Sequence, residues 1–300
     1  MSNKPSETLA AVMRWEEWPE ELSGLEQPSD EAPSSLQSAA VAALSATDLD
    51  KKVANTKRAA AFWFRGALST GGNRSMILPD RPGRPRNPIL VPPSKLKKRS
   101  IRSQRGRFAL LHAIAHIELN AVDLAWDVVA RFSHRTMPRS FYDGWVRVAL
   151  EEAKHFSLLR KRLAELGGAY GDLDAHDGLW EAAQSTGHDL TARLAIVPLI
   201  LEARGLDITP SLIRQMEDVG DEKSAAIFRI ILRDEEGHVA VGAKWFRFLC
   251  AKEGREPAKT FQTLVQKHFR GPLKPPFNDM ARARAGLTPD FYRTLSSAGT

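Results

Sequence analysis

The sequence predicts an all-α protein built around four long helices. Three observations carry this prediction. Polar side chains recur at steps of three and four residues through long stretches of the 300-residue chain, as one helix face requires. Gly and Pro gather in the segments between those stretches. A lone Glu followed by Glu-x-x-His occurs twice at matched spacing, first as Glu118, Glu152 and His155, then as Glu202, Glu235 and His238.

The N-terminal third is expected to hold a helix between two irregular segments. Residues 1–37 are rich in Ser, Pro and Glu and are predicted to be a disordered extension. Residues 38–65 are Ala-rich with few breakers, which predicts a helix. Residues 70–105 contain Gly-Gly, Pro-Gly and Pro-Pro pairs, so we expect an extended strap. Helix and strap together form a predicted N-terminal segment over residues 38–105.

The next segment is predicted to be one domain over residues 106–252, formed by helices at 106–134, 139–167, 178–206 and 210–252. The connection between the second and third helices is too long for a tight hairpin, which suits a crossover between two helix pairs. Pro198 lies inside the third helix and should kink it. Residues 253–300 are expected to form a tail with one short helix that packs on the bundle, followed by an extended GPLKPPFN segment.

Each predicted long helix carries one Glu on its apolar face. The neighbours of Glu118 at three, four and seven residues are apolar. Glu151 and Glu236 have charged neighbours, which leaves Glu152 and Glu235 as the inward carboxylates. A buried charge needs a partner or a metal. For any single Glu, a buried ion pair or a misplaced helix boundary is an equally good explanation, but it does not account for all four together with both histidines.

Four carboxylates and two imidazoles from four helices are the ligand set of a two-metal site in a ferritin-like bundle. Hard carboxylates with one imidazole per metal favour iron, with manganese as the alternative. The sequence therefore predicts two metal ions bound by Glu118, Glu152, His155, Glu202, Glu235 and His238. Each Glu-x-x-His pair should share one metal, and carboxylates should bridge the two.

Two further residues are candidates for a supporting role. Asp234 directly precedes the second Glu-x-x-His and can either orient a ligand histidine or pair with Arg233 or Lys223. Tyr142 lies ten residues before Glu152. It can carry a radical or line a channel, although packing is the favoured role.

The first long helix also carries an H-x-x-x-H pair, a spacing that can bind zinc. The pair belongs to a polar stripe that points away from Glu118 and comprises His112, His116, Asn120, Asp123, Asp127 and Arg131. We therefore predict that both histidines are surface or interdomain residues.

The positive charge of the chain is concentrated in one segment. The net charge is +7, and residues 81–107 hold ten Lys or Arg and no acid, so the remainder carries 7 − 10 = −3. A basic, Pro-rich segment can bind the phosphates of RNA. We favour a structural strap that meets acidic residues such as Asp123 and Asp127. Interleaved aromatic residues, which would stack on single-stranded bases, are absent from this segment.

Several features indicate a cytoplasmic protein. No apolar run is expected to reach the roughly 18 residues needed to cross a membrane. The N-terminus lacks a basic region followed by an apolar stretch. The single cysteine, Cys250, excludes an intrachain disulfide and is expected to pack at the end of the last long helix.

Five segments resemble a bacterial ferritin-like family catalogued as a domain of unknown function (number 455): HAIAHIELNAVDLAWD, EEAKHF, LEARGLDITP, RDEEGHVAVG and HFRGPLKPPFNDMARARAGL. The resemblance covers about residues 40–297. It implies the fold and the metal ligands at the positions given above, but no reaction. More distantly, the chain resembles di-iron hydroxylases that act on modified tRNA.

Three functions fit these observations. The first, which we favour, is an oxygen-dependent di-iron oxidase or monooxygenase with a small organic substrate. The second is an RNA-modifying hydroxylase in which residues 81–107 grip phosphates. The third is a ferroxidase or iron-binding protein without an organic substrate.

Overall fold

The computed structural model describes residues 33–73, 75–96 and 100–296. Most of the predicted extension over residues 1–37 therefore lies outside the described residues. Within the described ranges every regular element is a helix, and the only β-type pairing consists of isolated bridges. This confirms the all-α fold class.

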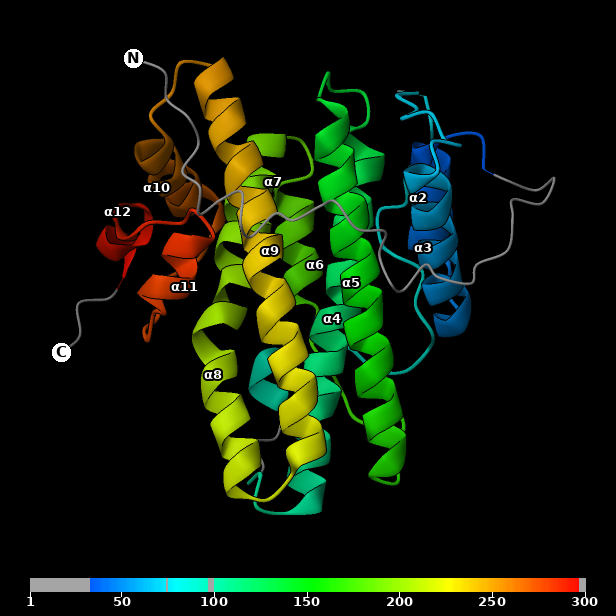
Figure 1. Cartoon of the computed structure of the whole chain (residues 1–300), viewed down its shortest axis with the longest axis vertical. Helices are drawn as coiled ribbons and strands as arrows, with labels where there is room; N and C mark the ends of the chain where they lie inside the picture. The colour runs from blue at the N-terminus through cyan, green and yellow to red at the C-terminus, as the bar shows by residue number, and fades with distance from the viewer. Residues whose placement is uncertain (1–32, 74, 97–99, 297–300) are drawn as a thin grey trace. The chain divides into compact units, whose positions relative to one another are not determined.

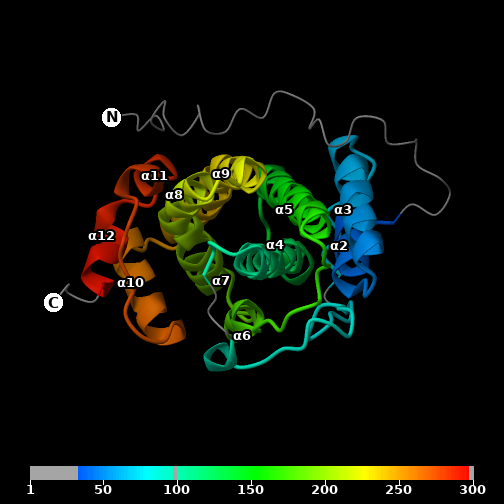
Figure 2. The ribbon, with the colours of Figure 1, turned by 90° about the horizontal axis from the view of Figure 1, so that it is seen from below.

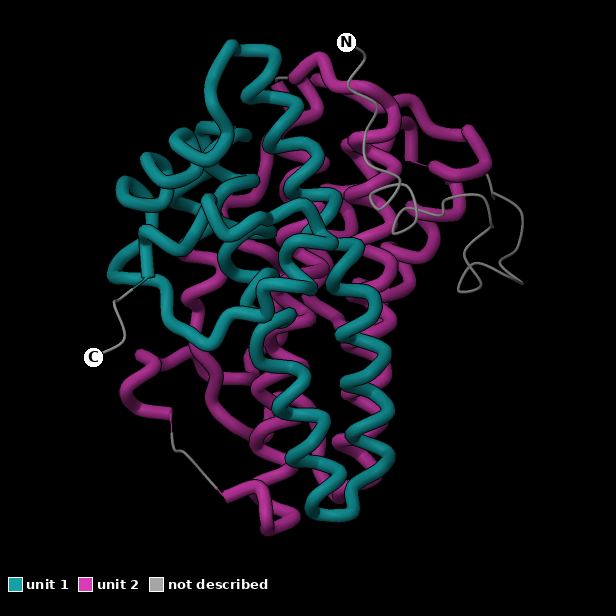
Figure 3. The backbone as a smooth tube through the Cα atoms, turned by 60° about the vertical axis from the view of Figure 1, so that its left-hand side comes forward, with its two compact units in different colours: residues 1–17, 182–300 teal, residues 18–181 magenta. Residues whose placement is uncertain are grey.

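The described residues fall into two compact units, coloured separately in Figure 3. The N-terminal unit extends to Glu181, and the C-terminal unit begins at Ala182. Helix α6 (Gly178–Ser185) crosses this boundary. The domain division predicted from the sequence stays a prediction.

The N-terminal unit is built on a hairpin of two long helices, α4 (Gln104–Phe132) and α5 (Arg139–Glu165), which lie side by side (Figures 1 and 2). Two shorter helices, α2 (Leu36–Ser45) and α3 (Leu49–Phe64), pack against the hairpin. The core between them is aromatic, with Trp63, Trp126 and Trp145 all fully buried. The predicted boundaries of the two long helices are confirmed to within two residues.

The predicted single helix over residues 38–65 is instead two helices. Asp48 interrupts it, because its side chain accepts a hydrogen bond from the Lys51 N–H and caps α3. An Asp that can satisfy a free backbone donor favours a new helix start over helix continuation. Ser35 caps α2 in the same way, so regular structure begins before residue 38.

Residues 70–105 are called the strap from here on. Those of them that the structure describes are irregular as predicted, apart from a short 3₁₀ turn η2 (Pro93–Lys95) and the start of α4. The strap is fastened to the rest of the N-terminal unit at several points. The Trp180 indole donates to the Asp80 carbonyl at 3.0 Å. Val91 and Ile89 exchange backbone hydrogen bonds with Ala175 at 2.8 and 3.0 Å.

The C-terminal unit contains a second pair of long elements side by side in Figure 1, α8 (Ala203–Asp218) and α9 (Glu222–Lys252). Before α8 the chain passes through α7 (Leu190–Ile196) and a π-helical turn η3 (Val197–Glu202). The predicted helix over residues 178–206 is thus wrong as one piece. Asp189 caps α7 and separates it from α6. The predicted disturbance at Pro198 takes the form of the π turn, since Pro has no N–H to donate and its ring crowds the preceding turn.

The predicted start of the fourth helix at residue 210 is also wrong. Pro210 lies inside α8, and the break comes at Gly220, whose φ of 71° ends that helix, followed by Asp221, which caps α9. Cys250 is buried near the end of α9, as expected.

The tail contains the predicted short helix, α10 (Pro257–His268), followed by the predicted irregular segment. Two further helices that the sequence did not suggest come next, α11 (Asp279–Arg284) and α12 (Pro289–Tyr292), and then the short turn η4 (Arg293–Leu295). A buried ion pair between Arg282 and Asp207, 2.6 Å long, holds the tail against α8.

By length and composition, α4 is the one helix among the described residues that qualifies as a candidate membrane span. The expectation that no apolar run is long enough is corrected on this point. Two thirds of the qualifying window (67%) is buried inside the structure, and buried core helices pass the same test.

Candidate metal centre

Three of the predicted ligands meet in the N-terminal unit. Glu118 comes from α4, and Glu152 and His155 come from α5. Each offers a ligand atom within 4.8 Å of the others. The Nδ1 atom of His155 lies 3.1 Å from Glu118 Oε2 and 3.3 Å from Glu152 Oε2. The three side chains are buried, with 3%, 0% and 0% of their residue surfaces exposed.

Helical periodicity brings these groups together. Residues three apart share a helix face, so Glu152 and His155 project in the same direction from α5. The hairpin lays this face against α4, which supplies Glu118. The adjacent Glu151 is oriented differently and pairs with Arg147 at 3.8 Å. The choice of Glu152 over Glu151 as the inward carboxylate is therefore confirmed.

The electrostatics of the cluster favour a bound cation. Burial, followed by the nearby Glu152 carboxylate, raises the pKa of Glu118 to about 8. Two carboxylates this close and this deeply buried resist ionising together, so one retains a proton unless a positive charge joins them. Two carboxylates and one imidazole are a donor set suited to a divalent iron or manganese ion. The residues present therefore fit the predicted metal.

The second set of predicted ligands lies in the C-terminal unit. Glu202 closes the π turn, and Glu235 and His238 share a face of α9. The Nδ1 atom of His238 is 3.7 Å from Glu235 Oε2. All three residues are buried, with exposures of 7%, 6% and 1%.

The side chain of Glu235 packs beside a glycine in α8. Gly205 lies one turn beyond Glu202, and a Cβ atom there would be 3.6 Å from the Glu235 carboxyl carbon. The carboxylate of Glu235 therefore rests against the backbone of the helix that begins at Glu202. Glu202 precedes α8 directly, and Glu235 contacts the first turn of that helix.

The two supporting candidates have local partners. Asp234 accepts a hydrogen bond from the Arg233 Nε–H at 2.8 Å, which is the ion pair that the sequence offered as one alternative. The Tyr142 hydroxyl lies 3.4 Å from the carbonyl oxygens of Ser133 and Arg135, at the loop of the α4–α5 hairpin. Its ring packs against Trp63. A role for either residue at the metal centre stays a prediction.

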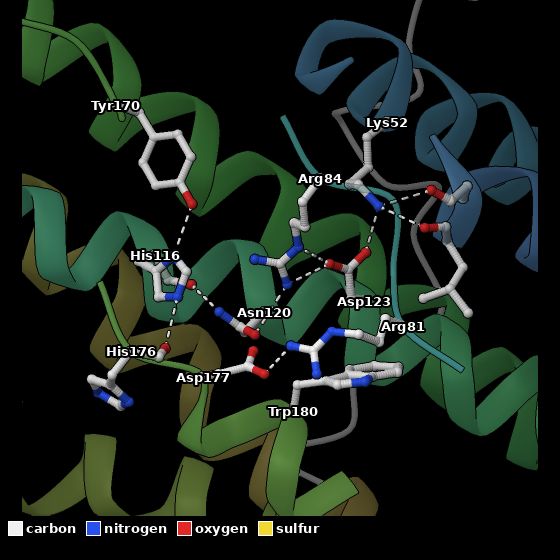
Figure 4. Close-up of polar contacts among 12 residues, drawn as sticks. Lys52, Arg81, Arg84, His116, Asn120, Asp123, Tyr170, His176, Asp177 and Trp180 are labelled. Atoms are coloured by element: carbon white, nitrogen blue, oxygen red, sulfur yellow. Dashed lines mark hydrogen bonds and ion pairs between the residues drawn. The ribbon is translucent and has the colours of Figure 1, made fainter. Parts of the chain in front are cut away.

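His112 and His116 were predicted to be surface or interdomain residues, and the surface alternative is wrong. They are 1% and 3% exposed, because the strap and the loop after α5 cover the polar face of α4. Figure 4 shows His116 between the Tyr170 hydroxyl, 2.8 Å from Nδ1, and the His176 carbonyl, 3.0 Å from Nε2. A carbonyl only accepts, so Nε2 carries the proton and Nδ1 accepts from Tyr170. Both ring nitrogens of His116 are therefore occupied, which excludes a zinc ligand in this arrangement.

Asp123 is the point where the strap and α3 meet α4 (Figure 4). Its carboxylate accepts from Arg84 Nε of the strap at 2.9 Å and from the Lys52 ammonium at 2.6 Å. Lys52 also donates to the carbonyls of Ala43 and Leu44 at the end of α2. The expected contact between the strap and Asp123 is confirmed through Arg84. Sequence reasoning missed the fully buried Lys52, because nothing in an amphipathic helix distinguishes this lysine from a solvated one.

Asp127, the other acid expected to meet the strap, pairs with an arginine of its own helix. Arg131 contacts it at 2.8 Å, an i,i+4 arrangement. The same arginine lies 3.5 Å from the Pro79 carbonyl of the strap. Arg131 thus links this position of α4 to the strap.

The comparisons with known proteins show the family of the chain. A curated relative, an uncharacterized protein of Haemophilus influenzae, is 44% identical over 209 residues, which are 68% of this chain and 73% of the relative. No solved structure matches the chain. The distant similarity to di-iron tRNA hydroxylases stays a prediction. The family described as "Protein of unknown function (DUF455)" matches residues 45–293, and the chain belongs to that family.

Proposed function

We propose that this protein is a two-metal carboxylate oxidoreductase that holds iron, or iron and manganese, and oxidises a small organic substrate with dioxygen. The observation that carries the proposal is the buried cluster of Glu118, Glu152 and His155, whose residue types recur in the C-terminal unit as Glu202, Glu235 and His238. Each set would hold one metal ion through its two carboxylates and its imidazole.

The donor chemistry supports redox metals over a structural ion. Structural zinc sites use thiolate and imidazole ligands in a closed shell, whereas this set is rich in hard oxygen donors. When bound, iron or manganese in such a site supplies one-electron steps and open positions for dioxygen. The protein residues hold the ions on helices, and such rigid elements keep ligand geometry fixed through redox changes.

The surroundings of the ligands support an organic substrate. Trp145, Val148 and Phe156 share the buried face of α5 with Glu152 and are at most 1% exposed. Apolar walls exclude water and suit a small organic molecule better than a stream of hydrated ions. A mineral-storing protein would need an acidic route for incoming Fe²⁺.

Metal content tests the ligand assignment directly. Wild-type protein reconstituted with Fe²⁺ without oxygen should retain two equivalents per chain after desalting. Glu152→Gln should retain less than about one, because the amide replaces a charged donor by a neutral one. Glu151→Gln is the matched control on the neighbouring, outward position and should retain two. Equal losses in both variants, or less than one equivalent in the wild type, would contradict the assignment.

Reaction with oxygen tests the choice between oxidase and ferroxidase. Stopped-flow absorbance with Fe²⁺-loaded protein and excess Fe²⁺ in air should show one stoichiometric oxidation that then stalls without an organic reductant or substrate. Many turnovers of Fe²⁺ with growth of a mineral core would sink the oxidase proposal in favour of a ferroxidase.

An RNA-modifying hydroxylase remains the second candidate, and one observation favours it. Four cations of the basic segment are exposed and have no acid partner among the residues that the structure describes: Arg86, Lys95, Arg102 and Arg105. Unpaired surface cations in one segment suit a phosphate backbone. Analysis of nucleic acid that co-purifies with the protein at low salt, before and after a high-salt wash, tests this candidate.

A further inference from the structure

A cleft of about 250 Å³ opens in the N-terminal unit between the strap, α4 and the loop that follows α5. Lys95 lines it from the strap, His112 from α4, and Asp172 and Asp174 from the loop. None of the metal ligands of this unit lines it. The cleft is therefore separate from the metal centre.

His112 is the buried polar residue among those that line this cleft. The Gly171 N–H donates to His112 Nε2 at 2.9 Å, so the proton of the neutral ring lies on Nδ1. Within the described part of the chain, Nδ1 has no hydrogen-bond acceptor. The residue is 1% exposed and one ring face stacks on Tyr170, with centroids 5.3 Å apart. A ligand that meets Nδ1 in the cleft would supply an acceptor for this proton.

The same hydrogen bond shows what kind of group His112 can bind. Because Gly171 occupies the Nε2 lone pair, Nδ1 is a donor and has no lone pair for a cation. This excludes His112 as a metal ligand in the cleft, despite the two nearby aspartates. The group that meets Nδ1 must be a hydrogen-bond acceptor.

The charges around the cleft are of both signs. The Lys95 side chain is exposed and carries an ammonium group without an acid partner among the described residues. Asp174 is exposed and likewise has no described cation partner. Asp172 accepts the Ala169 N–H at 2.7 Å with one oxygen. Apolar side chains, among them Ala109 and Ala113, also line it. The cleft thus combines hydrogen-bond donors, carboxylates and apolar surface.

We propose that this cleft binds a small zwitterion of the amino-acid class. The ligand carboxylate accepts from His112 Nδ1–H and from Lys95, and the ligand ammonium meets Asp174. The size agrees, because the cleft is smaller than the roughly 300–1,000 Å³ typical of sites for drug-sized ligands. The site goes beyond the proposed metal chemistry and does not depend on it.

Calorimetric titration with four five-carbon probes tests the charge requirement. The probes are L-norvaline and 5-aminopentanoate, which are zwitterions, and pentanoate and pentylamine, which each carry one charge. At least one zwitterion should bind to the cleft. Both single-charge probes should bind to the protein about tenfold more weakly than that zwitterion, or not at all, since each lacks one ion pair. Failure of both zwitterions to bind, or equal binding of a single-charge probe, overturns the proposal.

Variants locate the site. Asp174→Asn and Lys95→Gln should each weaken the bound zwitterion about tenfold. Arg105→Gln is the matched control, because it removes an exposed cation of the same basic segment that does not line the cleft. An equal loss in Arg105→Gln would mean non-specific charge attraction and would overturn the assignment.

An amino acid can also coordinate a metal, so the titrations are run on iron-loaded protein with the visible absorption spectrum recorded. Binding in the cleft should leave that spectrum unchanged and should persist in metal-free protein. A spectral change that accompanies binding and survives in Asp174→Asn would place the ligand at the metal and refute the cleft. Loss of the metal proposal alone would leave the cleft titration unaffected.

Discussion

Neighbouring glutamates in α5 show how far the surroundings of a residue determine its chemistry. Glu151 pairs with Arg147 at the surface, and Glu152 is fully buried beside His155. A solvated carboxylate in a surface pair contributes little to stability, whereas a buried one must find a cation or retain a proton. One residue of helical rotation, about 100°, separates these two situations.

Glu118→Leu should abolish metal binding without destabilising the metal-free protein. Burial and the Glu152 carboxylate raise the pKa of Glu118. In the metal-free protein this buried carboxyl group therefore lowers the folding stability, and leucine removes that unfavourable contribution. Thermal unfolding in chelator should show a melting temperature equal to or above that of wild type. With metal added, wild type should gain stability and the variant should not. A large loss of stability in chelator would point to a structural ion pair instead.

Because His112 is buried, we expect the stability of the protein to fall at acid pH. Burial lowers the pKa of this histidine, with a smaller opposing effect from Asp172. The ring is neutral when folded, so its contribution is complete above the unfolded pKa of 6.5 and is lost as the pH falls below that value. His112→Gln keeps an acceptor for Gly171 and cannot be protonated. The free energy of unfolding in urea, compared at pH 7.5 and 5.5, should therefore fall more in wild type than in the variant. An equal fall in both would contradict the role of His112.

At the scale of the element, the π turn η3 and its contact with α9 decide where Glu202 lies. Gly242 of α9 faces Pro198, and a Cβ atom there would lie 2.4 Å from the Pro198 Cβ. Real atoms do not approach so closely, so a side chain at this position forces the two elements apart. The turn ends at Glu202, and its displacement moves that ligand.

Gly242→Ala should therefore destabilise the protein by about 1–3 kcal/mol, as overpacking does, and lower its metal affinity. Gly237→Ala in the same helix is the control. A Cβ atom at Gly237 meets nothing within 4 Å, so this change should stabilise by roughly 0.5–1 kcal/mol through helix propensity. Urea unfolding of both variants makes the comparison. If both behave alike, the close approach of Pro198 is not what requires Gly242.

At the scale of the whole molecule, charge is divided between one segment and the rest. Residues 81–107 carry ten cations, and the rest of the chain is net negative. The structure describes two uses for this charge. Arg81 pairs with Asp177, and Arg84 pairs with Asp123. By contrast, the side chains of Arg86 and Lys95 are exposed to solvent. The segment therefore forms ion pairs with the rest of the N-terminal unit and also presents a positively charged surface to solvent.

These two uses predict different effects for matched substitutions. Arg84→Gln should lower the free energy of unfolding by about 1–3 kcal/mol, because it removes charge-assisted bonds to buried Asp123. Arg86→Gln should change it by less than about 0.5 kcal/mol, as exposed positions do. Filter binding with tRNA should show weak binding that both variants change little. Tight, salt-dependent tRNA binding that Arg86→Gln weakens would instead promote the hydroxylase candidate.

The burial of the candidate ligands and the inward faces of α4, α5 and α9 could be predicted from sequence, because each depends on the local period of the helix. Glu152 was separated from Glu151 on this basis alone. The helix starts at Asp48 and Asp189 also had a local signal in the sequence, since Asp is a preferred N-cap. The surrounding sequence nevertheless favoured one continuous helix, because it is Ala-rich around Asp48 and apolar after Asp189.

By itself the sequence determined the all-α class, the six candidate ligands and the irregular basic strap, because helical periodicity, Glu-x-x-His spacing and Pro content are all local properties. Tertiary structure alone decided the burial of His112 and His116, the ion pair of Lys52 with Asp123, and the course of the chain through Pro198 and Pro210. A polar stripe on a helix looks the same whether water or a strap covers it. Only the packing of distant segments removes the water, and that packing sets the charge state and partners of each side chain.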